Sequence, residues 1–308
     1  LTTVTDAIVT SVNYDADSER ATGVNVIDAN TKQGRAYTGR MIFLCASTLG
    51  TAQIMLNSLS EAFPNGIANR SGTLGRYLMD HIGGSTSSGT FPGHLDKYHS
   101  PRRPNECYIP RFRNVENKDE RFLRGFGYQG GARRPSWQRG AWTAGIGTEL
   151  KAALRQPAPW QFNIEGFGEM LPDARNRVWL DERKKDEWGI PILHIECEHR
   201  ENEKAMIRAM ADDAGEMLRA AGLRDIRLQA ELAPPGLLIH EMGTARMGHD
   251  SATSVLNGHN QAHDVPNLFV TDGAAMTSSA CQNPSLTYMA LTARAAATAV
   301  EMLQAGDI

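Results

Sequence analysis

The chain has 308 residues, enough to form one large domain or two ordinary ones around a substantial core. Its formal net charge of -3 gives no electrostatic reason to expect a nucleic-acid partner. No apolar run approaches the roughly 20 residues that a membrane-spanning helix needs, so no transmembrane segment is predicted. The 4 cysteines lie far apart and form no C-x-x-C pair, which predicts neither a zinc site nor a disulfide framework.

The N-terminal part of the chain alternates between apolar and polar residues as β-strands do. We expect strands at residues 7–14 and 23–29, and an approach to a third at 36–44. The continuous apolar run at 41–46 is typical of a short strand covered on both faces, and 51–59 has the spacing of a helix. A buried strand, a turn of small residues and a helix are typical of the end of a nucleotide-binding α/β unit.

The middle of the chain, residues 85–235, differs in composition and in its pattern of predicted elements. Gly, Pro, Arg and aromatic residues separate short strand-like pieces, such as 177–180 and 190–195. One amphipathic helix is predicted over 201–221, with Gly222 as its C-cap. This pattern predicts an α+β insert built on a mixed sheet.

Toward the C-terminus, the sequence again predicts a strand followed by a helix, as in an α/β unit. A compact strand is predicted at 267–271, and an Ala-rich helix at 284–304 with proline in its first turn. The predicted organisation is therefore two α/β segments, 1–84 and 236–308, on either side of the insert at 85–235.

The letters GFGYQG at 125–130 match the dinucleotide-binding pattern G-x-G-x-x-G. That pattern binds a pyrophosphate only where a strand precedes it and a helix opens within it. Here GARRP follows and cannot open such a helix, so we predict that this match is not a nucleotide site.

The letters HEMGT at 240–244 begin like the zinc-protease pattern H-E-x-x-H. Thr244 stands where the second histidine ligand would be, so no metal site of that type is predicted. His249, His259 and His263 follow in a stretch rich in Gly, Asn and Asp; they are compatible with a metal-binding loop, and more readily with scattered surface histidines.

Several blocks spread along the chain carry a common signature. Residues 237–297 include LLIHEMGTARMG, NLFVTDGAAM and SSACQNPSLTYMALTARAA, and residues 75–81 read GRYLMDH. The strands TDAIVTSVNY, ATGVNVID and RMIFLCAS stand near the N-terminus, and NRVWLD at 176–181 lies in the insert. Together, and in this order, these blocks resemble the GMC (glucose–methanol–choline) flavoprotein oxidoreductases.

The resemblance implies FAD as cofactor and an α/β FAD-binding domain made from residues 1–84 and 236–308. Residues 85–235 would be the inserted α+β substrate-binding domain. The G-x-G-x-x-G turn with which the family holds the ADP part of FAD is not among the quoted blocks. We therefore expect the first βαβ unit to be missing here and to be supplied by an N-terminal segment. Without it, the apolar strand at 41–45 would face water and FAD would not be held.

The resemblance also implies a catalytic pair. His240 takes the place of the family's catalytic histidine, and the second member of the pair falls at Asn283. A His–Asn pair resembles a sugar-oxidising group of the family that includes pyranose oxidases and fructose or glucoside dehydrogenases. The chemistry is consistent: a neutral imidazole can accept the hydroxyl proton, and a side-chain amide can donate to the developing alkoxide while hydride passes to flavin N5.

The same resemblance implies three groups of cofactor-binding residues. They are Asp272, Gly273 and Ala274 at the pyrophosphate and ribityl chain; Asn283, Pro284 and Ser285 at the isoalloxazine; and Val9, Ala46 and Ser47 at the adenosine end. Packing in the core explains Val9 equally well, and an ordinary strand-to-helix turn would also explain the residues 272–274.

The amino-acid sequence of the C-terminal blocks most resembles that of bacterial glucoside 3-dehydrogenase-like large subunits. This implies oxidation of a glycoside ring hydroxyl to a ketone, with electrons passed to a cytochrome c subunit and possible assembly with a small subunit. An oxidase that uses O₂, and a non-catalytic carbohydrate-binding subunit, are the alternatives. Both bacterial periplasm and cytoplasm stay open as locations. The insert offers candidate sugar contacts, for which packing is the competing explanation: Trp137, Trp142, Trp160, Gln161, Asn163 and Glu165.

Overall fold

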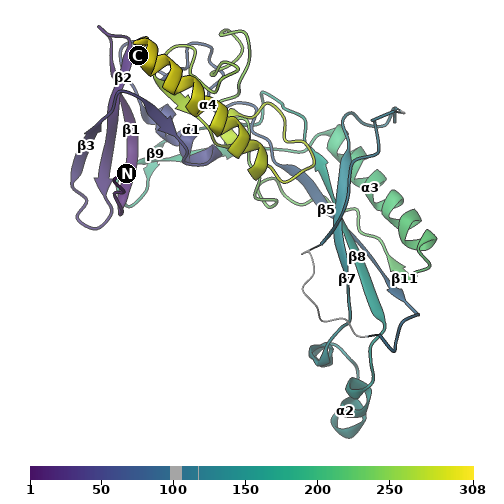
Figure 1. Cartoon of the computed structure of the whole chain (residues 1–308). Helices are drawn as coiled ribbons and strands as arrows, with labels where there is room; N and C mark the ends of the chain where they lie inside the picture. Colours follow the sequence, from purple (N-terminus) through teal and green to yellow (C-terminus); the bar gives the residue numbers. More distant parts are fainter. Residues whose placement is uncertain (98–105, 117) are drawn as a thin grey trace.

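The computed structural model describes residues 1–97, 106–116 and 118–308. These residues form two parts at opposite ends of an elongated molecule (Figure 1). One part holds the N-terminal strands and the C-terminal helix, and the other holds a five-stranded sheet with a helix on one face. Within the described ranges, no helix is long and apolar enough to cross a membrane.

The first part contains two small sheets. Three antiparallel strands form one of them: β1 (Ala7–Asp15), β2 (Arg20–Asp28) and β3 (Gly34–Thr38). The other is a parallel pair, β4 (Ile42–Leu44) and β12 (Leu268–Val270). The single strand approached at 36–44 is therefore two strands in two sheets. The difference is physical, because β3 is exposed throughout whereas Ile42 and Leu44 of β4 are buried.

Two helices cover the parallel pair. Helix α1 (Thr48–Asn57) follows β4 directly and starts three residues earlier than its spacing predicted, because the chain reverses at Ser47, whose φ of 69° is left-handed. The predicted C-terminal helix is α4 (Ser285–Ala305). Phe43 and Phe269 stack with ring centroids 4.8 Å apart and pack with the buried face of α4, so this helix completes the core on its side.

The second part is one antiparallel sheet with the strand order β11-β5-β8-β7-β6. Its strands are β5 (His81–Phe91), β6 (Cys107–Ile109), β7 (Phe126–Arg133), β8 (Trp160–Glu169) and β11 (Arg224–Arg227). The prediction of a mixed sheet was therefore wrong for the described residues. A parallel pair needs a crossover connection between its strands, and all four neighbouring pairs of this sheet are antiparallel instead.

That helix is α3 (Glu201–Ala220), which agrees with the predicted span, and Gly222 follows it with a left-handed φ of 80°. Two glycines of β8 let α3 approach closely: a Cβ on Gly166 would lie 2.8 Å from Sδ of Met210, and one on Gly168 would lie 2.4 Å from Cε of Met210. The face of β8 that carries Gly166 and Gly168 therefore points at α3. Since side chains alternate along a strand, Glu165, Phe167 and Glu169 point to the opposite face.

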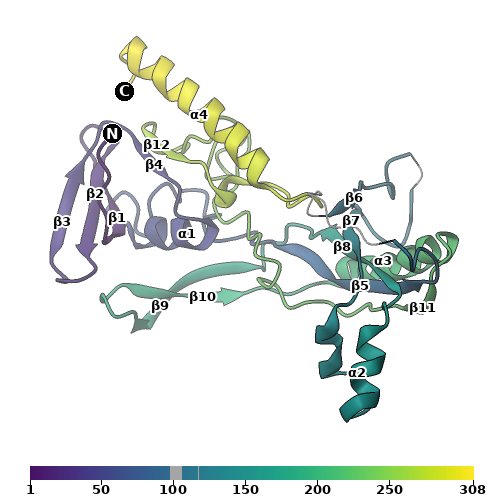
Figure 2. The same ribbon diagram turned by 60° about the horizontal axis from the view of Figure 1, so that its bottom comes forward.

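A hairpin of β9 (Arg177–Lys185) and β10 (Pro191–Glu196) reaches back to the first part and lies alongside α1 (Figure 2). Val178 of this hairpin is buried with Ala52 of α1 and with Leu78. The remaining elements, the 3₁₀ helix η1 (Trp137–Ala141) and the helix α2 (Gly147–Arg155), form an excursion beyond the far end of the sheet.

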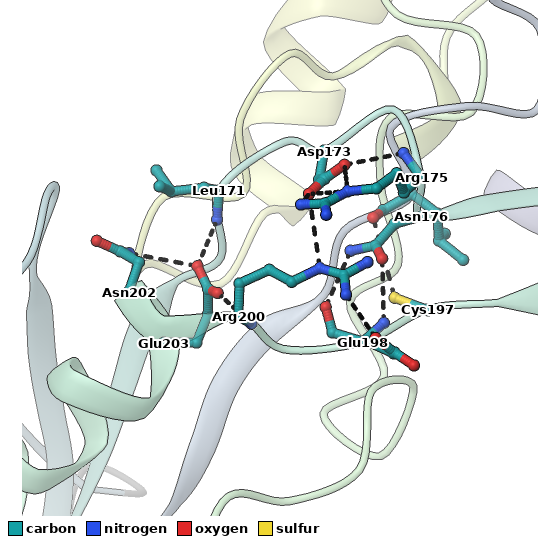
Figure 3. A network of polar contacts seen from close by, with 10 residues as sticks. Leu171, Asp173, Arg175, Asn176, Cys197, Glu198, Arg200, Asn202 and Glu203 are labelled. Carbon is teal, nitrogen blue, oxygen red and sulfur yellow. Dashed lines mark hydrogen bonds and ion pairs between the residues drawn. The ribbon is translucent and has the colours of Figure 1, made fainter.

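Polar contacts tie together the two stretches that lead to and from this hairpin (Figure 3). Asn176 accepts a hydrogen bond from the backbone N–H of Glu198 at 3.1 Å, and its side-chain amide donates to the carbonyl of the same residue. Glu203, in the first turn of α3, accepts from the backbone N–H groups of Leu171 and Arg200. These bonds hold the two stretches together at the base of the hairpin. The predicted domain limits at residues 84 and 235 stay predictions.

Candidate active site

One buried carboxylate holds the loop that carries His240. Asp80, which is 1% exposed and directly precedes β5, accepts four backbone hydrogen bonds. Its Oδ2 accepts from the N–H groups of Gly236 and Leu238, at 2.8 and 3.1 Å. Its Oδ1 accepts from the N–H groups of His240 and His81, at 3.1 and 2.7 Å. The loop is thereby fixed to the first strand of the sheet.

His81, the residue after Asp80, packs against the ring of His240. The rings of His81 and His240 have centroids 4.8 Å apart and are nearly perpendicular, at 88°. Burial lowers the pKa of His81, and the neighbouring His240 lowers it further, against an opposing contribution from Asp80. His81, which is 1% exposed, is therefore a neutral imidazole near neutral pH. Nδ1 of His240 is buried and has no hydrogen-bond partner among the described residues.

Asn283 lies in the turn before α4 and is anchored to the sheet. Its Oδ1 accepts a hydrogen bond from Nε2 of Gln129 on β7, at 2.9 Å. This bond fixes which end of the amide faces the sheet, and it leaves Nδ2 of Asn283 to donate elsewhere.

His240 and Asn283 are anchored on the same face of the sheet. Gln129 pairs with Glu165, and His81 pairs with Glu169, both across antiparallel neighbours. Directly paired residues point to the same face. Both anchors therefore lie opposite α3, with β8 between them, and the predicted pair is brought to one surface.

The predicted turn at 272–274 lies next to the loop of His240. The N–H of Gly243 donates to the carbonyl of Gly273 at 3.0 Å. A Cβ on Gly273 would lie 2.6 Å from the carbonyl oxygen of Glu241 and 2.4 Å from Oγ1 of Thr48. Only glycine therefore allows the two segments to approach this closely.

The turns that follow β4 and β12 meet at one edge, because the two strands are parallel. Oδ2 of Asp272 accepts from Oγ1 of Thr51 at 2.5 Å, and its Oδ1 accepts from the N–H of Ala274 at 2.9 Å. Burial raises the pKa of Asp272, and these hydrogen bonds oppose the change. Ala46 and Ser47, from the other turn, are exposed at this edge.

The N-terminus of α4 stands directly after Asn283. Pro284 is its N-cap residue and provides no side-chain cap, and the first turn, which begins at Ser285, holds no acidic residue. An uncapped end of a 21-residue helix leaves N–H groups and a partial positive charge available for an electron-rich group. Val9 lies in β1, half-buried against the core of the first part, so its predicted contact with a cofactor stays a prediction.

The structure places the candidate sugar contacts in different regions of the second part of the molecule: on the excursion around η1 and α2, and on the two faces of the sheet. Trp137 and Trp142 are 75% and 77% exposed on the excursion around η1 and α2. Trp160 lines an apolar cavity of about 630 Å³ with residues of α3, on the covered face of the sheet. Asn163 and Glu165 alternate with the residues that face α3, and so they share the face of Gln129. Burial raises the pKa of Glu165, and Glu106 raises it further.

Other histidines and the glycine-rich match have structural surroundings of their own. The letters GFGYQG run into β7, so they form a strand instead of a turn before a helix. Nε2 of His263 contacts Oγ of Ser254 at 3.0 Å, and Nδ1 of His259 contacts Oγ1 of Thr298 at 3.2 Å. Among the residues that the structure describes, no cluster of His, Cys, Asp and Glu has the geometry to hold a metal ion.

Sequence reasoning assigned no role to Asp80, His81 or Gln129. Asp80 and His81 were visible only as the end of the GRYLMDH block, and Gln129 lay inside the rejected glycine-rich match. Their partners lie between 154 and 160 residues away, apart from the amide that His81 donates to its neighbour Asp80.

Known proteins similar to this chain agree on one family. The sequence profile described as GMC oxidoreductase matches residues 172–292. The 2-methyl-1,2-propanediol dehydrogenase of Mycolicibacterium austroafricanum is 31% identical over 285 residues, covering 90% of this chain and 50% of that protein. The fructose dehydrogenase large subunit of Gluconobacter japonicus is 27% identical over 304 residues, covering 98% and 54%. The chain thus spans about half the length of these relatives.

Solved structures share the fold. A formate oxidase variant from Aspergillus oryzae matches with a TM-score of 0.65 at 15% identity, over 98% of this chain and 60% of that one. An FAD-dependent oxidoreductase from Chaetomium thermophilum matches with a TM-score of 0.57 at 14% identity, over 98% and 62%. The sequence relatives and the shared fold lead to one conclusion: the chain belongs to the GMC oxidoreductase family, and its cofactor is FAD.

Proposed function

We propose that this chain supplies the substrate-binding and proton-transfer part of an enzyme that oxidises a sugar or glycoside ring hydroxyl to a ketone. The observation that carries the proposal is the anchoring of His240 and Asn283 on one face of the sheet. Asp80 holds the first of them, and Gln129 holds the second. The turn at 272–274 lies beside the loop of His240, which supports a cofactor contact of this turn close to the proposed base.

The two residues divide the chemistry between them. The imidazole of His240 accepts the proton of the substrate hydroxyl, a role that histidine commonly has in catalysis. Nδ2 of Asn283 donates a hydrogen bond to the same oxygen as negative charge develops on it. When bound, FAD supplies the acceptor for the hydride that leaves the substrate carbon.

The residues present fit a flavin. The turn of Asp272, Gly273 and Ala274 would face the pyrophosphate and ribityl chain, and Ala46 and Ser47 would lie toward the adenosine. The uncapped N-terminus of α4, with Asn283, Pro284 and Ser285, would face the electron-rich edge of the isoalloxazine. Val9 is proposed at the adenosine end on the family resemblance alone.

A polar sheet face favours a polyhydroxylated substrate. Asn163 and Glu165 share the face of Gln129 and can hydrogen-bond further hydroxyl groups. Relatives with sugar or glycoside names support this class: the fructose dehydrogenase large subunit, and a C-glycoside 3-oxidase of Microbacterium trichothecenolyticum, 27% identical over 90% of this chain and 50% of that protein. The diol dehydrogenase named above makes small diols the necessary comparison.

We place the remaining parts in a larger assembly. A segment carrying G-x-G-x-x-G would hold the ADP part of FAD. A cytochrome c subunit would receive the electrons, and a small subunit would join the assembly. The large-subunit name of the relative from Gluconobacter supports the presence of further subunits.

The test uses the protein together with that segment, mixed without oxygen with glucosides, fructose and small diols. We expect a flavin spectrum that is bleached by a glycoside faster than by a diol. Faster bleaching by the diol would contradict the proposed substrate class. Peroxide formation in air would favour an oxidase, and a complete protein without flavin would favour the non-catalytic binding subunit.

A further inference from the structure

We propose that Asp80 and His81 are positioning residues for His240: Asp80 holds the backbone beneath it, and His81 holds its ring. This inference rests on the proposed function, because it assigns a role to residues that act through the proposed base. Asp80 contacts the backbone of the loop that carries His240, and His81 contacts its ring, so both act through the proposed base.

The carboxylate of Asp80 joins segments that are distant in sequence. Its bonds to Gly236 and His240 span 156 and 160 residues. Asp186 makes an instructive contrast, since it also accepts two backbone N–H groups, those of Trp188 and Ile190, but both belong to its own hairpin turn. Asp186 shapes a local turn, whereas Asp80 fixes one segment of the molecule onto another.

The clamped loop contains a strained residue. Ile239 has a φ of 56°, in the left-handed region that β-branched residues almost never adopt. Its side chain is 76% exposed, so its own packing does not explain the conformation. The N–H groups of Leu238 and His240, on either side of it, both donate to Asp80. The two bonds therefore hold the backbone of Ile239 in this strained conformation, directly before His240.

His81 restrains the other end of His240. Its ring is buried and stands perpendicular to the ring of His240 at 4.8 Å. Its backbone N–H also donates to Asp80, at 2.7 Å. A single dipeptide thus fixes both the main chain and the ring plane of the proposed base.

The test begins with Asp80→Asn, which keeps the shape of the side chain but offers an NH₂ group to two of the amides that now donate to it. Asp186→Asn is the matched control, because it makes the same change at a carboxylate that accepts backbone amides away from the site. We expect Asp80→Asn to lose hydrogen-exchange protection at Gly236, Leu238 and His240. Flavin reduction at saturating substrate should slow by roughly 10- to 100-fold, as expected for a misplacement of about 1 Å, with a smaller change in KM.

A second substitution separates positioning from general damage. Glycine adopts a positive φ without strain. If Asp80 acts by holding Ile239, the double substitution Asp80→Asn, Ile239→Gly should recover part of the lost rate. His81→Ala should slow reduction while the three loop amides stay protected, and it decides the question if Asp80→Asn does not fold.

The inference would be overturned by protection that persists in Asp80→Asn, by reduction that stays fast although protection is lost, or by an unchanged rate in His81→Ala. A double variant no faster than Asp80→Asn would equally count against it. The rate of flavin reduction in His240→Ala distinguishes a failure of the positioning role from a failure of the proposed function. Fast reduction in His240→Ala would refute the function itself, whereas slow reduction there with normal Asp80→Asn and His81→Ala would refute only the positioning role.

Discussion

The side-chain amide of Gln129 donates to Oδ1 of Asn283 at 2.9 Å and thereby sets which end of the Asn283 amide is free to face a substrate. Gln129→Ala removes the anchor but imposes no alternative, so we expect flavin reduction to slow about fivefold, the equivalent of one hydrogen bond of about 1 kcal/mol. Gln129→Glu can only accept, so it should turn Nδ2 of Asn283 toward itself and slow reduction further. Stopped-flow rates for the two variants check this order, and equal rates would show that the orientation of Asn283 is unimportant.

Asn283→Ala should affect the rate more than substrate binding. A donor that stabilises charge on the substrate oxygen acts mainly in the transition state, and loss of one such donor typically costs about 10²- to 10³-fold in kcat. Reduction rates measured over a range of substrate concentrations separate kcat from KM. A rise in KM alone would make Asn283 a residue that binds the ground state.

Neighbouring glycines of β7 should respond differently to alanine. A Cβ on Gly130 would lie 2.1 Å from the carbonyl oxygen of Asn163, a backbone atom of the adjacent strand, whereas nothing lies within 4 Å of a Cβ on Gly131. Gly130→Ala should therefore lower the free energy of unfolding by about 1–3 kcal/mol, and Gly131→Ala should change it by less than about 0.5 kcal/mol. Urea unfolding measures both. A tolerant Gly130 would mean that sheet packing does not explain this glycine.

Acid should weaken the polar network beside the hairpin (Figure 3). The hydrogen bonds from Arg175 lower the pKa of Asp173 from 3.8 to about 2. A lowered pKa means that the stabilisation is present above the unfolded value and is lost as pH falls from 3.8 toward about 2. Since Arg175 is largely exposed, Asp173→Asn should cost less than about 1 kcal/mol at neutral pH. The difference from the wild type in urea unfolding should shrink on acidification, and a difference that grows would contradict the sign.

The sequence predicted what local patterns determine. The spans of α3 and α4 follow from helical periodicity and from Gly222 and Pro284 at their ends. Strand direction in the five-stranded sheet depends on contacts between distant segments, and the prediction of a mixed sheet was wrong for that reason. The residues that anchor the candidate site were not predicted, for the same reason. Asp80 and Gln129 show no local pattern, because the loop of His240 and Asn283, which they hold, lie more than 150 residues away.

The most direct test of the account is the rate of flavin reduction in His240→Ala. The variant should keep FAD bound, because His240 is proposed to act on the substrate and not to hold the cofactor. Loss of a general base typically costs about 10²- to 10⁴-fold, so reduction at saturating sugar should slow by that factor in stopped-flow measurements. A flavin-loaded variant whose reduction slows by less than about threefold would remove His240 from the mechanism.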